Sequence, residues 1–363
     1  MKIALVHDAL VNRGGAERVF QALCSMFPES KLYTSVYFPD KTYPFFKTRD
    51  ITTSRLQRYV SSESQLKALF PLANYLMGKL DVGDVDLILS SSTFSGKHIR
   101  KKNARHICYC YTPFRLLWSE GAYSTQGGMG QISRFIGPLL PPLRRWDYAA
   151  AQRVDQFIAM TEGTRKRILQ HYNRDSIVIP PPIDCSRYGL SNDSEDYFLL
   201  VSRLEPYKKV DLVIDAFRKT GLHLKIVGAG SLRRSLMERN SPNIEFLGSV
   251  ADEELIALYQ KCRAVVFPQE EDYGLVPLEA NACGKPVICY GRGGVETTMV
   301  PYTQNASSGA SALFFPKQSV DSLVDALRTF EGISFNPESL VKNAKRFDLP
   351  QFCSKIRNVI ENT

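Results

Sequence analysis

The chain has 363 residues, of which 44% are hydrophobic and 11% aromatic, and its formal net charge is +9 at pH 7. This length exceeds the usual range of a single domain, so we expect two domains with packed cores. No apolar run approaches 18 residues and the opening MKIALVHDAL lacks a signal-peptide pattern, which predicts neither a membrane span nor a cleaved leader. Eight scattered cysteines without a C-x-x-C pair predict free thiols in a reducing, cytoplasmic compartment.

The positive charge is concentrated in the first half of the chain. Residues 1–190 contain 26 Lys/Arg and 15 Asp/Glu, whereas residues 191–363 contain 20 and 22. A basic first half suits an anionic lipid surface, a phosphate-bearing acceptor or nucleic acid, although a merely solvated basic face fits equally well. Residues 132–146 mix apolar side chains, three prolines and three arginines, so they are expected either to touch a membrane surface or to form a packed loop and helix.

Short β-branched runs alternate with helical stretches along the chain. In the first half we expect, in order, the strand KIALV, a helix over residues 16–26, the strands VDLILS, HICYCY and QFIAM, a helix over residues 164–171 and the strand SIVIP. The rhythm then restarts with YFLLVS, a helix over 210–219, HLKIVG, a helix over 232–239, IEFLG, a helix over 252–262, and the strands AVVFP and VICYG.

This alternation is typical of parallel sheets whose two faces are covered by helices. The predicted fold class is α/β, with two Rossmann-like doubly wound domains whose ligands lie beyond the carboxyl ends of the strands. Prolines at 180–182 and a polar stretch at 191–196 place the boundary near residue 190. The expected domains are residues 1–190 and 191–345, followed by a C-terminal helix over residues 346–363.

The segment AVVFPQEEDYGLVPLEANACGKPVICYG predicts a strand, a loop, a short helix and a second strand. A turn at Gly274 would leave the N–H groups of Leu275 and Val276 without backbone partners at the positive end of the helix dipole, where a diphosphate fits. Glu271 in the loop and Glu279 in the helix are carboxylates suited to sugar hydroxyls. The alternative is a solvated Glu271 and a Glu279 that only stabilises the helix.

A second cluster of candidate residues lies in VSRLEPYKKVDLVIDAF. Arg203 and Lys208 follow a strand and precede a helix, so they should project from the carboxyl end of that strand. Two fixed cations can neutralise a diphosphate leaving group without a metal. The alternative reading makes Lys208 and Lys209 surface lysines near a helix start, where the helix dipole disfavours positive charge.

These segments resemble the retaining glycosyltransferases of family 4, which have the GT-B fold with two Rossmann-like domains facing across a cleft. The resemblance covers essentially the whole chain and is strongest over residues 198–300. It implies that residues 1–190 form the acceptor side, that residues 191–345 bind the nucleotide-sugar donor, and that the C-terminal helix over residues 346–363 crosses back onto the first domain. It rests on S-R-L-x-P-x-K (Ser202 to Lys208), V-G-A-G-S-L (Val227 to Leu232), E-D-Y-G-L-V-P-L-E (Glu271 to Glu279) and G-R-G-G-V-E-T (Gly291 to Thr297).

The resemblance implies roles for the residues at these motifs. Arg203 and Lys208 would hold the donor diphosphate, Glu271 would contact the transferred sugar, and Glu279 would hold the ribose. Backbone donors would come from Gly274, Leu275 and Val276, and Gly230 belongs to the same donor side. The loop N-R-G-G-A-E is similar to the family's glycine loop, where Gly14 and Gly15 let the backbone approach the donor.

The acceptor-side candidates are Asp8, Tyr111 and Arg115. The run C-Y-C-Y-T-P-F-R-L-L-W resembles a segment of bacterial polysaccharide mannosyltransferases, in which a histidine is expected before Thr-Pro. Tyr111 occupies that position here, so the chain departs from the family pattern. Arg115 is expected to be a cation in the cleft or, alternatively, to serve packing alone.

The resemblance further implies GDP-mannose as donor, a UDP-sugar as the alternative, and transfer with retained configuration by a front-face, ion-pair-like substitution. Expected partners are the nucleotide-sugar donor and a glycan or lipid-linked acceptor, with peripheral contact to an anionic membrane on its cytoplasmic face. No cofactor is expected. No metal is expected either, because Asp84-Val85-Asp86, which has the D-x-D pattern of a metal site, is interpreted as a turn before a strand.

Two rival classes are weaker. A nicotinamide-dependent enzyme would need a third glycine where Arg233 stands, and nucleic-acid binding has no motif beyond the basic charge.

Overall fold

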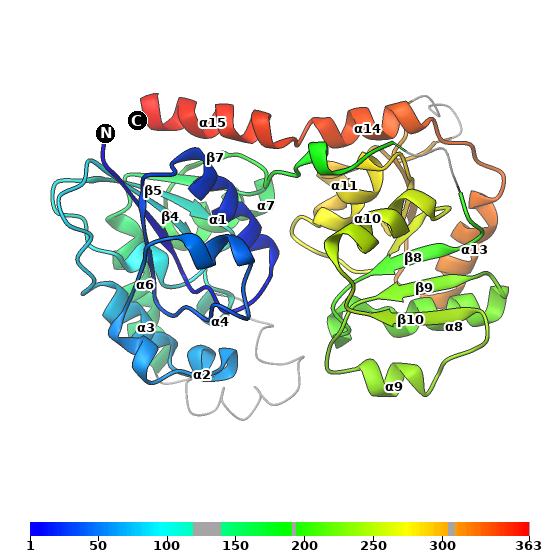
Figure 1. The fold of residues 1–363 in the computed structure, drawn as a ribbon, viewed down its shortest axis with the longest axis horizontal. Coiled ribbons are helices and arrows are strands. Elements are labelled where there is room, and N and C mark those ends of the chain that lie inside the picture. The colour runs from blue at the N-terminus through cyan, green and yellow to red at the C-terminus, as the bar shows by residue number, and fades with distance from the viewer. Residues whose placement is uncertain (119–138, 191–193, 304–308, 363) are drawn as a thin grey trace. The chain divides into compact units, whose positions relative to one another are not determined.

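The computed structural model describes residues 1–118, 139–190, 194–303 and 309–362. Contacts divide the chain into two compact units (Figure 1). The first unit comprises Met1–Pro182 and Phe352–Thr363, and the second comprises Ile183–Gln351. Residues 132–138 lie outside the described residues. They are part of the segment expected either to touch a membrane surface or to form a packed loop and helix. Residues 191–193, next to the predicted boundary, also lie outside the described residues.

The first unit contains a seven-stranded parallel sheet with the strand order β3-β2-β1-β4-β5-β6-β7. The order reverses between β1 and β4, which are neighbours in the sheet. The interior strands are almost entirely buried because helices cover them, as the apolar runs of the sequence require. The strands are β1 Ile3–His7, β2 Lys31–Thr34, β3 Ile51–Thr53, β4 Leu87–Ser92, β5 Arg105–Cys110, β6 Gln156–Ala159 and β7 Ser176–Val178.

The helices of the first unit include one that returns from the far end of the chain. Helix α15, Leu349–Asn362, buries Phe352, Ile356, Val359 and Ile360, and the ring of Phe352 lies 5.9 Å from that of Tyr109 on β5. Figure 1 shows α15 at one end of this unit and α2 and α3 at the other. The other helices are α1 Gly15–Met26, α2 Glu63–Ala68, α3 Phe70–Met77, α4 Arg115–Trp118, α6 Leu140–Gln152 and α7 Glu162–Tyr172, with 3₁₀ turns η1 Pro44–Thr48, η2 Arg55–Arg58 and η3 Gly96–His98.

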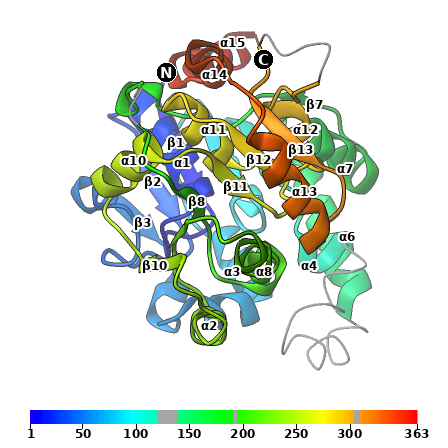
Figure 2. The same ribbon diagram turned by 90° about the vertical axis from the view of Figure 1, so that its right-hand side faces the viewer.

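The second unit contains a six-stranded parallel sheet with the order β10-β9-β8-β11-β12-β13. Here the order reverses between β8 and β11. Helices α8 and α13 pack together over one face, and α11 packs against α14 on the other (Figure 2). The strands are β8 Phe198–Val201, β9 Leu224–Val227, β10 Ile244–Gly248, β11 Val265–Phe267, β12 Val287–Tyr290 and β13 Ala312–Phe315. The helices are α8 Val210–Thr220, α9 Arg233–Met237, α10 Asp252–Lys261, α11 Leu275–Ala282, α12 Val295–Thr298, α13 Val320–Phe330 and α14 Pro337–Lys345, with 3₁₀ turns η5 Cys185–Arg187 and η6 Pro206–Lys208.

The predicted fold class, two doubly wound parallel α/β sheets, is confirmed. The contact division falls at Pro182/Ile183, whereas the sequence predicted a boundary near residue 190. Asp84 and Asp86 precede β4, and the Asp86 carboxylate accepts a hydrogen bond from the backbone N–H of Lys2 at 2.6 Å. Across the described residues, no helix combines the length and apolarity needed to cross a bilayer.

Candidate active site

The strand order of the second unit identifies where its ligand site should lie. In doubly wound sheets ligands bind outside the carboxyl ends of the two strands between which the order reverses. These strands are β8 and β11, and they continue into the loops 202–209 and 268–274. The structure therefore brings the predicted residues Arg203, Lys208 and Glu271 together at one edge of one sheet.

Glycines allow neighbouring loops to pack against these two loops. A Cβ on Gly230, after β9, would lie 2.4 Å from the backbone oxygen of Leu204. A Cβ on Gly294, after β12, would lie 2.3 Å from the backbone oxygen of Tyr273. Both approaches are too close for any other residue, so the predicted Gly230 supports the site by holding the Arg203–Lys208 loop in place.

Lys208 and Glu271 form an ion pair across the reversal point. The Lys208 Nζ contacts Glu271 Oε1, and the two side chains are only 11% and 25% exposed. The Gln269 amide donates to the same carboxylate oxygen at 3.3 Å. Burial lowers the pKa of Lys208 to about 8, and the nearby charge of Arg203 acts in the same direction. The pair is thus a partly desolvated cation beside a carboxylate, each able to contact a ligand.

Tyr207 organises the two cations of this loop, a role that sequence reasoning missed. The Arg203 guanidinium donates to the Tyr207 hydroxyl at 2.5 Å, and the Lys208 Nζ lies 5.0 Å from the centre of the Tyr207 ring. Arg203 itself is exposed. The ring therefore contacts both cations at once. The only signal available in the sequence was an aromatic residue between the two predicted cations.

Helix α11 begins beside this cluster. Gly274 precedes it with φ = 84°, a conformation that favours glycine, and a Cβ there would also lie 3.0 Å from the Phe267 ring. Leu275 and Val276 are the first two helical residues, whose N–H groups have no intrahelical acceptor. Glu279, one turn later, is only 4% exposed, and its Oε2 accepts a hydrogen bond from Tyr259 at 2.8 Å.

The first unit has its own reversal point, between β1 and β4, and Asp8 lies there. The Asp8 carboxylate accepts hydrogen bonds at 2.5–3.0 Å from the backbone N–H groups of four consecutive residues, Thr93 to Gly96. The hydroxyl of Ser92 donates to it as well, at 2.8 Å. Asp8 therefore fixes the loop that follows β4. Its carboxylate oxygens are occupied by the protein's own donors.

The carbonyls of the same loop are held from the other side by a buried lysine. Lys97 Nζ donates to the Phe94 oxygen at 2.9 Å and pairs with Asp147 at 2.8 Å, with both side chains 1% exposed. Asp147 also accepts from Tyr172 and Trp118, each at 2.8 Å. Burial opposes ionisation of Asp147, but the adjacent Lys97 and His98 outweigh it and hold the pKa of this carboxyl well below its usual range.

Tyr111 belongs to a buried polar chain that starts at the glycine loop. Its hydroxyl donates to the Ala16 oxygen at 2.8 Å and contacts Ser91 Oγ at 2.7 Å. Ser91 in turn lies 3.1 Å from Nδ1 of His7, whose other ring nitrogen is 4.0 Å from Glu17. Burial raises the pKa of Tyr111 well above its ordinary value.

The glycine loop is closed by the same Glu17. The backbone N–H of Gly14 donates to Glu17 Oε2 at 3.1 Å, and Gly15 begins α1. His7, Ser91 and Glu17 were not predicted as site residues. Of the three acceptor-side candidates, Asp8 and Tyr111 are buried and form hydrogen bonds within the first unit. Arg115, the first residue of α4, is exposed.

Two protein families match consecutive parts of the chain. Residues 13–187 match Glycosyltransferase Family 4, and residues 186–347 match Glycosyl transferases group 1. The chain belongs to the family 4 glycosyltransferases. The second match contains the Lys208–Glu271 pair and the whole cluster around it.

Curated relatives share low sequence identity with this family 4 chain. The O-antigen chain mannosyltransferase C of Escherichia coli is 30% identical over 138 residues, which are 33% of this chain and 37% of that protein. The D-inositol 3-phosphate glycosyltransferase of Kineococcus radiotolerans is 28% identical over 217 residues, 49% of each. The chain thus matches less than half the length of these relatives. Alpha-1,3/1,6-mannosyltransferase ALG2 of Candida glabrata is 22% identical over 98% of this chain and 90% of that protein.

Solved structures share the fold over the full length. HepE of Anabaena, in complex with UDP, has a TM-score of 0.71 at 16% identity and covers 100% of both chains. Sucrose-phosphate synthase of Thermosynechococcus elongatus has a TM-score of 0.74 at 16% identity, covering 100% of this chain and 99% of that one. The predicted GT-B fold is confirmed by these neighbours.

Proposed function

We propose that this protein transfers a sugar from a nucleotide-sugar to an acceptor hydroxyl with retention of configuration. The donor is GDP-mannose, and the acceptor is a glycan or a lipid-linked glycan. The observation that carries the proposal is the Lys208–Glu271 pair at the reversal point of the second sheet, inside the region matched by Glycosyl transferases group 1.

In the proposed complex the two partners of this pair separate. The donor diphosphate takes over the Lys208 ammonium together with the exposed Arg203, because a diphosphate with two formal negative charges competes well for a partly buried cation. Glu271 is thereby released to accept hydrogen bonds from the sugar hydroxyls. The N–H groups of Leu275 and Val276 add donors at the start of α11.

The chemical step breaks the bond between the anomeric carbon and the diphosphate oxygen. The acceptor oxygen forms the new bond on the same face of the sugar, and its proton passes to the departing phosphate oxygen. Negative charge grows on the diphosphate during this step, so Arg203, Lys208 and the start of α11 stabilise the transition state more than the ground state. The proposed step uses no metal and no cofactor.

Glu279 is proposed to hold the donor ribose. It is buried and its Oε2 accepts a hydrogen bond from Tyr259, so a ribose would reach it only after a local rearrangement. Gly14 and Gly15 are proposed to approach the donor from the first unit, and Arg115 to contact the acceptor.

Support for mannose comes from relatives. The Escherichia coli relative is named an O-antigen chain mannosyltransferase, and the Candida glabrata relative is a mannosyltransferase that aligns over 98% of this chain. A UDP-sugar is the second candidate donor, because the Anabaena neighbour was crystallised with UDP and with UDP-glucose.

A thermal-shift panel with GDP, UDP, GDP-mannose and UDP-glucose tests both candidates. A ligand at one hundred times its Kd stabilises the folded state by about 2.7 kcal/mol. We expect a shift selective for the GDP compounds in the wild type, its loss in Arg203→Ala, and its persistence in Arg218→Ala, an exposed arginine on α8 of the same unit.

A shift selective for the UDP compounds would retain the enzyme class and replace the donor. No shift with any nucleotide, from protein shown to be folded, would overturn the proposed function. In a transfer assay, Arg203→Ala should lower turnover by about 10²–10³-fold.

A further inference from the structure

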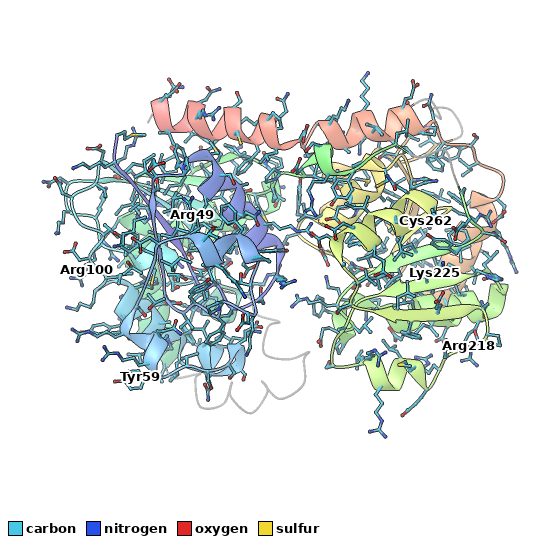
Figure 3. The ribbon with its side chains drawn as sticks, in the orientation of Figure 1. Arg49, Tyr59, Arg100, Arg218, Lys225 and Cys262 are labelled. Carbon is cyan, nitrogen blue, oxygen red and sulfur yellow. The ribbon has the colours of Figure 1, made fainter. Side chains whose placement is uncertain are left out.

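One surface of the first unit combines exposed apolar side chains with basic ones. Among the described residues, Tyr59 is 70% exposed, Tyr75 51%, Leu72 40% and Leu69 37%. All four fall within the seventeen consecutive residues from the end of η2 to α3, and Figure 1 shows α2 and α3 at the end of the unit opposite α15. Tyr59 lies at this same end in Figure 3. Exposed apolar residues that gather in one place mark an interaction site.

Helix α3 is apolar on both of its faces. Phe70, Ala73 and Met77 are buried against the unit, and the ring of Phe70 meets that of Phe114 at 5.0 Å. The opposite face carries Leu72 and Tyr75, and Leu69 precedes the helix. A helix on the surface of a water-soluble domain normally presents polar residues there. The inner face of α3 already supplies the residues that pack into the core, so core packing does not account for the apolar residues on the outer face.

Basic residues surround the apolar ones. Residues 55–79 contain four basic side chains and one acidic side chain. The acidic one, Glu63, pairs with Lys67 at 2.7 Å, and Lys79 lies over the ring of Tyr75 at 5.6 Å. Arg55, Arg58, Lys67 and Lys79 are all exposed.

We propose that this surface, made of Tyr59, Leu69, Leu72 and Tyr75 with Arg55, Arg58, Lys67 and Lys79, docks the protein on an anionic lipid bilayer. Tyrosine and leucine side chains enter the boundary between headgroups and acyl chains, while lysine and arginine remain at the level of the negative headgroups. A protein partner would instead require a complementary acidic surface and would not depend on lipid charge.

The proposed membrane docking does not depend on which nucleotide-sugar is the donor. It assigns membrane contact to one surface of the first unit, whereas the charge count of the sequence only indicated that residues 1–190 are basic. It also agrees with a lipid-linked acceptor, because docking would hold the enzyme beside membrane-bound substrate.

Co-sedimentation with vesicles tests the proposal. We expect the wild type to bind vesicles that contain phosphatidylglycerol at low salt and to be released as salt rises, with little binding to phosphatidylcholine alone. Lys67→Ala/Lys79→Ala should weaken binding by about fivefold for each lysine removed. Leu72→Ser/Tyr75→Ser should weaken it at least about tenfold.

Matched controls lie outside the surface. Arg218→Ala/Lys219→Ala removes two exposed cations from α8 of the second unit, and Leu169→Ser/Ile177→Ser removes two exposed apolar side chains from elsewhere in the first unit. Arg218 is labelled on the second unit in Figure 3. Both control variants should bind vesicles as the wild type does.

The proposal is wrong if the wild type does not bind anionic vesicles at low salt, if it binds neutral vesicles equally well, or if the controls lose as much binding as the surface variants. Nucleotide thermal shifts measured on the same variants separate this outcome from the proposed function. Surface variants should keep the shift, and a protein that binds vesicles but no nucleotide would retain the docking surface and lose the proposed donor site.

Discussion

Lys208 is a cation held largely out of water, and this gives the proposed reaction a pH dependence. Its pKa in the free protein is about 8, lowered from 10.5 first by burial and then by Arg203. Since only the protonated form can bind a diphosphate as an ammonium, kcat/KM should fall as pH rises through about 8. A bound diphosphate favours the ammonium, so the corresponding limb of kcat should lie at higher pH.

Rate profiles of the wild type and Lys208→Arg check this expectation. Arginine stays charged throughout the range, so the variant should lack the alkaline limb even if its overall activity is lower. An alkaline limb that is unchanged in Lys208→Arg would assign the ionisation to another group. The lowered pKa of Lys208 also affects stability. Between about pH 8 and 10.5 this lysine is protonated in the unfolded chain but largely neutral in the folded protein, so the free energy of unfolding should rise with pH over this range.

Tyr207 is expected to act as a positioning residue, through its contacts with Arg203 and Lys208. Tyr207→Phe removes the hydroxyl but keeps the ring, so it should loosen Arg203 and raise the Kd for nucleoside diphosphate by about three- to tenfold. Tyr207→Ala removes both contacts and should do more, and it should also shift the alkaline limb of kcat/KM, because the ring no longer lies against Lys208. Titration calorimetry and the pH profile measure these effects. Equal, wild-type values in both variants would contradict the assignment.

Sequence motifs predicted the residues that lie close in the chain to a strand end, such as Arg203, Lys208 and Gly274. They could not predict the buried chain of His7, Ser91 and Tyr111, since the His7–Ser91 contact joins residues 84 apart. Neither residue pattern nor spacing indicates that a predicted acceptor-side group such as Tyr111 will be hydrogen-bonded inside the domain. That outcome depends on the register between β1 and β4, which only the folded sheet defines.

At the scale of elements, the loop after β4 depends on one carboxylate. Asp8→Asn keeps the shape but replaces one acceptor oxygen with an amide NH₂ that faces backbone donors. We expect the free energy of unfolding of the first unit to fall by about 2–4 kcal/mol. Asp84→Asn, an exposed aspartate in the same unit, should be nearly neutral.

Intrinsic tryptophan fluorescence during urea unfolding is a suitable measurement, because both tryptophans of the chain, Trp118 and Trp146, belong to the first unit. If Asp8→Asn and Asp84→Asn unfold at the same urea concentration, the four amide contacts do not hold the loop as the structure indicates.

Elements with a clear period were predicted well. The expected helices over residues 16–26, 210–219 and 252–262 correspond to α1, α8 and α10 within one residue at each end. Helices α2 and α3 were not predicted, because Leu69, Leu72 and Tyr75 lie outside the core and obscure the apolar period that marks an amphipathic helix. Strands β2 and β3 are four and three residues long, too short for an alternating pattern to show.

For the whole molecule, α15 is the segment that joins the end of the described chain to the first unit. Ile356 is fully buried and Phe352 nearly so, and the Arg105 guanidinium donates to the backbone oxygen of Ile360. Ile356→Ala should lower the free energy of unfolding of the first unit by about 2–5 kcal/mol. Lys355→Ala, on the exposed face of the same helix, should have little effect.

Tryptophan fluorescence also measures this change. Helix α15 contains no tryptophan, so the signal comes from the first unit, against which α15 packs. Loss of stability in Lys355→Ala equal to that in Ile356→Ala would point to helix propensity instead of burial. The proposed nucleotide binding by the second unit should be less affected than the fluorescence transition, because α15 beyond Gln351 is assigned to the first unit.

The position of α15 also bears on how the molecule is made. The second unit is one uninterrupted stretch, Ile183–Gln351, whereas the first is assembled from two stretches separated by the whole of the second. On the ribosome, the second unit can complete its structure as soon as its own residues emerge. The first unit begins to emerge earlier but cannot be completed until the second unit has been synthesised. During this time the hydrophobic surface that receives Phe352 and Ile356 remains uncovered. This interval is when the nascent chain would most need a chaperone.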